Sequence, residues 1–180
     1  MVLLYLIMKI HQILLLFFIS FSCNANKNLK PEQLNITKPI SCPEDGVCTF
    51  QVLKNKTYTI KKDEFGNSYS EILNGKKTVL KFEYKRNELK GVQDSSYREL
   101  IYVEIDPENL ELNLTNENLQ KANIGFERLC FCRGQTGSYV LTQGHLLITK
   151  IQDNEFNITL DFKTDKVPQV ITSINENFKL

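Results

Sequence analysis

The chain has little charge imbalance, and this argues against nucleic acid as a partner. Its 180 residues contain 22 basic and 21 acidic side chains, a formal net charge of +1. Basic pairs such as Lys61-Lys62 and Lys85-Arg86 stand beside turns or acids and do not form a stripe. Because nucleic-acid binding depends on a concentrated positive field, we expect no nucleic-acid partner.

Sequence motifs of catalysis are also missing. The chain has neither the Gly-x-Ser-x-Gly turn of a serine hydrolase nor a phosphate-binding loop. It has two histidines, and only His145 follows the N-terminal apolar run. His145 comes just after a turn at Gln143-Gly144, where an exposed loop histidine is the ordinary interpretation. The sequence therefore favours a non-enzymatic protein without a cofactor or a metal.

The sequence lacks an apolar run long enough to predict a membrane-spanning helix. The run Ile13–Phe21 has about nine residues, whereas a spanning helix needs about 20. Lys9 stands between Met8 and this run, which is the order of residues in a secretory signal. We predict that residues 1–22 are a removable signal peptide, with Met8 as the true start.

The segment Ser20-Phe21-Ser22-Cys23 resembles the lipobox of bacterial lipoproteins. Ser22 is the small residue expected before the lipid-carrying cysteine, whereas Ser20 and Phe21 stand where Leu and Ala or Ser are usual. Lipoboxes this loose, followed by an Asn- and Lys-rich chain, are similar to those of Bacteroidota lipoproteins. The resemblance implies lipidation of Cys23 and an anchor on the periplasmic side of the cell envelope. Ordinary signal cleavage is the alternative, because Ser20 and Ser22 also fit the small-x-small rule.

The cysteines that follow Cys23 are even in number, which favours disulfides in an oxidising compartment. They are Cys42, Cys48, Cys130 and Cys132. A bond between Cys130 and Cys132 would cross a single residue and strain the link, so we predict cross-links from this pair to Cys42 and Cys48. A local Cys42 to Cys48 bridge is the competing pattern. The spacings fit neither the usual zinc ligand loops nor a two-residue redox motif.

The chain after Cys23 divides into a tether and one domain. Residues 24–41 are polar, contain Pro31 and Pro39, and have no helical or strand periodicity. We therefore interpret residues 23–41 as a lipidated cysteine with a flexible tether, and residues 42–180 as the folded domain.

From Val47 onward, apolar residues recur at every second position, as they do in strands with one buried face. The rows are Cys48/Phe50/Val52, Tyr58/Ile60, Leu80/Phe82/Tyr84, Ile101/Val103/Ile105, Leu110/Leu112/Leu114 and Phe156/Ile158/Leu160/Phe162. Helical spacing is found only weakly, around Asn116 to Ala122. We predict an all-β fold, a single antiparallel sandwich or barrel of about eight or nine strands.

Turn residues separate these rows. Asn74-Gly75, between two apolar stretches, is the strongest hairpin signal in the chain, and it predicts a type I′ turn. Further turns are predicted at 63–67, 133–137, 143–144 and 153–154. The segments 137–148 and 156–162 are similar to closing hairpins of uncharacterised Bacteroidota lipoproteins, a resemblance that implies no particular site.

Two other groups of polar residues have ordinary interpretations. Asp94-Ser95-Ser96-Tyr97-Arg98-Glu99 enters an apolar strand, and its acids beside Arg98 are expected to form solvated ion pairs. Asn-x-Ser/Thr triplets, the acceptors of N-glycosylation in eukaryotes, begin at Asn35, Asn55, Asn113 and Asn157, but an Asn-rich chain yields such triplets by chance.

The sequence thus predicts an exported, lipid-anchored envelope protein whose β domain binds a protein or glycan partner or supports an assembly. An envelope hydrolase that uses His145 is one alternative. A secreted, disulfide-stapled inhibitor or ligand carrier is another, and it would require Cys23 to be free of lipid.

Overall fold

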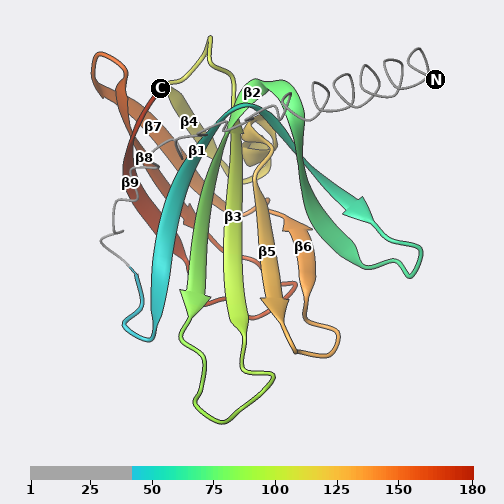
Figure 1. The fold of residues 1–180 in the computed structure, drawn as a ribbon. Helices are drawn as coiled ribbons and strands as arrows, with labels where there is room; N and C mark the ends of the chain where they lie inside the picture. Colours follow the sequence, from blue (N-terminus) through green and yellow to red (C-terminus); the bar gives the residue numbers. More distant parts are fainter. Residues whose placement is uncertain (1–41) are drawn as a thin grey trace, which may run out of the picture. The chain divides into compact units, whose positions relative to one another are not determined.

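The computed structural model describes residues 42–180, which form two antiparallel sheets (Figure 1). One sheet has five strands in the order β1-β2-β3-β5-β6, and the other has four in the order β4-β7-β8-β9. The elements are β1 (Gly46–Lys62), β2 (Ser68–Arg86), β3 (Tyr97–Ile105), β4 (Leu112–Thr115), the 3-10 helix η2 (Asn116–Ala122), β5 (Gly125–Cys130), β6 (Gly137–Val140), β7 (Gly144–Gln152), β8 (Glu155–Phe162) and β9 (Ser173–Lys179). The predicted all-β sandwich is confirmed.

The core lies between the two sheets and is made by the alternating rows. Phe82 of β2 and Ile158 of β8 are examples of inward-facing side chains that are almost fully buried. Rings from the two sheets meet across the core, with Phe126 and Phe162 centroids 6.1 Å apart and Phe50 and Phe178 centroids 6.3 Å apart. Burial of apolar side chains, these rings among them, is the main stabilising contribution to a sandwich of this kind.

The predicted hairpin turn at Asn74-Gly75 is wrong. Both residues lie inside β2, and the chain reverses instead at 63–67, where a turn was also predicted. The positive φ that the Asn-Gly pair suggested occurs on the opposite strand, at Asn55 (φ 56°), where the β1–β2 register shifts. Gly75 serves a close approach: a Cβ there would stand 2.9 Å from the Cβ of Thr57.

The register shift at Asn55 divides the β1–β2 hairpin in two. The part beyond the shift, residues 56–74, is the outer half of the hairpin, and it meets the outer face of the five-stranded sheet. Glu104 of β3 accepts hydrogen bonds from Thr57 Oγ1 at 2.6 Å and from the Tyr58 backbone N–H at 2.8 Å. A second apolar cluster, separate from the main core, is buried here by Tyr58, Val79, Leu100 and Tyr102. The hairpin therefore covers one part of this outer face.

The weak helical spacing at Asn116–Ala122 corresponds to η2, which connects the four-stranded sheet to the five-stranded one. Leu119 and Ala122 are its buried residues, and Asn123 ends it in a left-handed conformation. No helix within residues 42–180 is both long and apolar enough to cross a membrane. The predicted signal peptide, Cys23 and the tether lie outside the described residues.

Candidate functional site

The disulfides of the domain are both local, and the predicted cross-links are wrong. Cys42 pairs with Cys48, with Cα atoms 5.7 Å apart, and Cys130 pairs with Cys132, with Cα atoms 5.2 Å apart. Cys48 is on β1 and Cys130 is on β5, with β2 and β3 between them. Three strand spacings amount to about 14 Å, twice the reach of a disulfide between Cα atoms.

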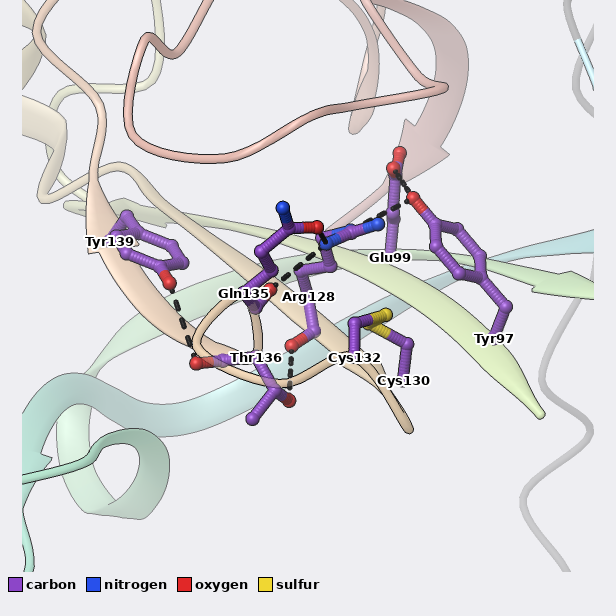
Figure 2. The surroundings of a disulfide bond; sticks show 8 residues. All are labelled: Tyr97, Glu99, Arg128, Cys130, Cys132, Gln135, Thr136 and Tyr139. Carbon is purple, nitrogen blue, oxygen red and sulfur yellow. Dashed lines mark hydrogen bonds between the residues drawn. A yellow bond between two sulfur atoms is a disulfide. The ribbon is translucent and has the colours of Figure 1, made fainter. Parts of the chain in front are cut away.

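The Cys130–Cys132 disulfide closes the start of the β5–β6 connection, and the chain bends at Phe131 between the two cysteines. Hydrogen bonds brace the rest of this connection (Figure 2). Arg128 Nη1 donates to the Gln135 backbone oxygen at 3.1 Å and to its side-chain oxygen at 2.9 Å, and Thr136 Oγ1 donates to the Arg128 backbone oxygen at 2.9 Å. The loop is therefore held in one conformation by contacts in addition to the disulfide.

A buried polar cluster lies beneath this loop. Two guanidinium groups lie over the Tyr97 ring, that of Arg86 4.3 Å and that of Arg128 5.2 Å from its centroid. Its hydroxyl donates to Glu99 at 2.5 Å and accepts from Arg128 Nε at 3.2 Å. Burial, and secondly the bond to Glu99, raise the pKa of Tyr97. Tyr97 is thus a neutral link between a cation and a carboxylate.

Glu99 is fully buried, which corrects the expectation that the acids beside Arg98 form solvated ion pairs. Its carboxylate accepts the backbone N–H groups of Val170 and Ile171, both at 2.7 Å, and so fixes the β8–β9 connection against β3. Arg98 does form an ion pair, with Glu83 at 2.8 Å, on the opposite face of the sheet. The contacts of this cluster join segments of the domain to one another, so its role is structural.

An open concavity of about 530 Å³ lies on the outer face of the five-stranded sheet, between the β2–β3 loop and the β5–β6 loop. Both loops extend from the same end of this sheet (Figure 1). The residues that line it are Lys85, Glu88, Asp94, Ser96, Arg98, Leu129, Cys130, Phe131 and Thr136. Cations and acids are mixed along its wall, with Phe131 as the aromatic residue.

Phe131 is the feature of this concavity that sequence reasoning missed. Its side chain is 81% exposed although both neighbours are joined in a disulfide. Leu89 and Val92 of the β2–β3 loop are exposed too, at 62% and 53%. The sequence did contain a signal for this exposure. In the alternation Cys130-Phe131-Cys132 the aromatic side chain points to the face opposite to the two cysteines. We name the concavity with Phe131, Leu89 and Val92 the loop-end surface.

His145 lies on β7 of the other sheet and does not line the concavity. Its Nε2 lies 2.8 Å from the side-chain oxygen of Asn113, an amide and not a carboxylate. A general base in a hydrolase is ordinarily oriented by an acid. The observed partner of His145 therefore gives the hydrolase hypothesis no support.

Metal binding and N-glycosylation are the two other kinds of site that the sequence raised. Within residues 42–180 no three His, Cys, Asp or Glu side chains are grouped so that they could hold a metal ion. Of the glycosylation triplets, Asn157 uses its amide nitrogen to bond Asn175, Glu176 and Asn177 across the β8–β9 pair. Asn55 is exposed, and Asn35 lies outside the described residues.

Comparisons with protein-family models, with curated proteins and with solved structures found no match for this chain. The loop-end surface and the sequence features that precede the domain are therefore the parts of the molecule that point to a function.

Proposed function

We propose that this chain is an exported protein, anchored in the bacterial envelope by a lipid on Cys23, whose β-sandwich binds a protein partner through the loop-end surface. Support for export and anchoring comes from the apolar run at 13–21 and the lipobox-like segment that ends at Cys23. The polar stretch 24–41 would hold the domain away from the membrane.

One observation carries the binding proposal: Phe131 is 81% exposed and flanked by two cysteines of one disulfide. Exposing a large aromatic ring to water forgoes roughly 2 kcal/mol of burial energy. A ring whose backbone is already restrained loses little conformational entropy when it is buried by a partner. Rigid aromatic side chains of this kind are common energetic centres of protein interfaces.

The surroundings of Phe131 fit a protein partner better than a glycan. Leu89 and Val92 are exposed apolar residues of the β2–β3 loop, and Lys85, Glu88 and Asp94 supply charged groups along the wall of the concavity. An apolar centre with a charged, solvent-accessible margin is the usual anatomy of a protein interface. The β2–β3 loop is internally bonded, because Ser95 Oγ accepts from the Leu89 N–H at 3.0 Å and donates to the Val92 oxygen at 3.1 Å.

The binding proposal is tested with a photo-crosslinking phenylalanine analogue placed at position 131 of the full chain, expressed in its own host. Phe65 provides a matched control, because it is also 81% exposed but lies in the β1–β2 turn. We expect a crosslinked protein from position 131 and not from position 65. Affinity of the purified partner should then fall at least tenfold with Phe131→Ser and less than twofold with Phe65→Ser.

Equal crosslinking from both positions, or equal affinities of both variants, would refute the loop-end surface as the binding site. A crosslinked product whose added mass is removed by glycosidases, and which contains no peptides of a second protein, would replace the protein partner with a glycan.

The anchor is tested separately by metabolic labelling with a clickable fatty acid. We expect label in the wild-type protein and none in Cys23→Ala. Unlabelled wild-type protein would favour the secreted inhibitor or ligand carrier, in which the loop-end surface keeps its binding role.

A further inference from the structure

We propose that the Cys130–Cys132 disulfide is a thiol–disulfide exchange site that oxidises exposed dithiols of other proteins. This activity goes beyond the proposed binding, because exchange needs only a transient encounter. It is carried by the contrast between the two disulfides of the domain and by the placement of this one at the loop-end surface.

The two disulfides differ in accessibility. Cys48 is 4% exposed, within the main core cluster, so in the Cys42–Cys48 bond a thiolate can approach only the half-buried sulfur of Cys42 without local opening. Cys130 and Cys132 are both half-buried, and Cys130 lines the open concavity. Exchange requires direct approach of a thiolate to a sulfur along the S–S axis, so access is the first condition for it.

The fold depends little on the Cys130–Cys132 bond. It closes a loop with one intervening residue, and the chain entropy that a disulfide removes from the unfolded state falls as the loop shortens. The β5–β6 connection is also held by the bonds of Arg128 to Gln135 and of Thr136 to Arg128. Reduction therefore leaves the loop folded, as a reversible exchange site requires.

Basic residues flank the two cysteines in the sequence. The nearest charged residues in the sequence are Arg128, two positions before Cys130, and Arg133, directly after Cys132. Cations beside a cysteine lower the pKa of its thiol and make it a better leaving group in exchange. Lys85 and Arg98 also line the concavity, together with the acids Glu88 and Asp94.

The exchange step balances without another reactant. A thiolate of the client attacks one sulfur of the Cys130–Cys132 bond, forms a mixed disulfide and releases the other cysteine as a thiolate. A second client thiolate then attacks the client sulfur of the mixed disulfide and releases the first cysteine. Two electrons pass from the client to this protein, which ends as a dithiol and takes up the two protons, while the client gains a disulfide.

The first experiment titrates the full exported chain with dithiothreitol, alkylates it, and measures each disulfide by peptide mass spectrometry. We expect Cys130–Cys132 to be half-reduced at a dithiothreitol concentration at least tenfold lower than Cys42–Cys48, which serves as the internal control. The circular dichroism spectrum should not change at the first midpoint. Equal midpoints, or loss of the β spectrum together with Cys130–Cys132, would overturn the proposal.

The second experiment mixes the oxidised chain with a reduced synthetic peptide that contains two cysteines. We expect one peptide disulfide per chain, with loss of the Cys130–Cys132 bond, and a mixed disulfide that the peptide cannot resolve when the peptide contains a single cysteine. The double variant Cys130→Ser/Cys132→Ser should lose the transfer. Transfer that persists in the double variant would contradict the assignment. Neither experiment uses the protein partner proposed above, so failure of that binding leaves these results unaffected.

Discussion

Tyr58 stacks on Tyr102 with ring centroids 4.5 Å apart, and this contact joins the outer half of the β1–β2 hairpin to the five-stranded sheet. Glu127 accepts hydrogen bonds from the Tyr102 hydroxyl at 2.9 Å and from Ser138 Oγ at 3.0 Å. Burial raises the pKa of both tyrosines, and the charge of Glu127 adds to this effect. Both hydroxyls are therefore neutral, and the hairpin is held by packing and hydrogen bonds.

Gly125 is required where the Tyr58 side chain crosses β5. A Cβ on Gly125 would collide with the Tyr58 hydroxyl and ring. Gly125→Ala should lower the free energy of unfolding by about 1–3 kcal/mol, as overpacking does, measured by urea denaturation. In a double-mutant cycle with Tyr58→Phe, which removes the nearest atom, the combined cost should be smaller than the sum of the single costs. Strictly additive costs would show that the two residues do not touch.

Glu99 fixes the β8–β9 connection by accepting two backbone N–H groups inside the protein. In Glu99→Gln a neutral amide replaces the carboxylate, and its NH₂ group must face a donor. We expect a loss of about 2 kcal/mol in the free energy of unfolding, the value of charge-assisted hydrogen bonds. Glu88→Gln, at an exposed position, is the control and should change stability by less than about 0.5 kcal/mol. Similar losses in both variants would contradict the role of Glu99.

Asn55 has a left-handed backbone conformation where the β1–β2 register shifts. Asn55→Val should cost about 1–2 kcal/mol, because a side chain with a branched Cβ clashes with the backbone in this region. Asn55→Gly should keep the wild-type thermal midpoint or raise it. The neighbouring exposed Lys54 provides the control, and a loss from Lys54→Val as large as that from Asn55→Val would refute the conformational explanation.

The Glu83–Arg98 ion pair predicts a pH dependence of stability. Burial by itself raises the pKa of Glu83, but the hydrogen bond and charge of Arg98, with a contribution from Lys81, hold it below the ordinary value of 4.5. Because the pKa of Glu83 is lower in the folded state, its carboxylate stabilises the protein at pH values above the ordinary pKa. This contribution is lost as the pH falls through the folded pKa. Wild type should therefore be more stable than Glu83→Gln at pH 7, and the difference should shrink below about pH 4. Thermal midpoints at both pH values provide the measurement, and a constant difference would refute the prediction.

The alternation of apolar residues determined much of the fold by itself. The row from Phe156 to Phe162 predicts a strand with one buried face, and β8 has that pattern because each side chain's direction depends only on its own strand. Turns at 63–67 and 153–154 were predicted for the same reason, since their residues favour a reversal of the chain locally. The weak helical signal at Asn116–Ala122 likewise corresponds to η2.

The tertiary structure decided which segments are neighbours. Asn74-Gly75 has the local chemistry of a turn, yet β1 pairs with β2 on both sides of it, so the pair lies within a strand. Cys48 and Cys130 are alternative partners in the sequence, but the order of strands in the sheet places them beyond the reach of a disulfide. Glu99, among polar neighbours in the sequence, is buried because the β8–β9 connection folds over it.

The sequence by itself thus determined an all-β domain, the inward face of its strands, and the expectation that it is exported behind a cleavable segment. Only the tertiary structure decided the local pairing of the cysteines, the exposure of Phe131 and its place beside an open concavity. The physical reason is that side-chain alternation is a property of one strand, whereas strand order and loop proximity depend on contacts between residues far apart in the chain.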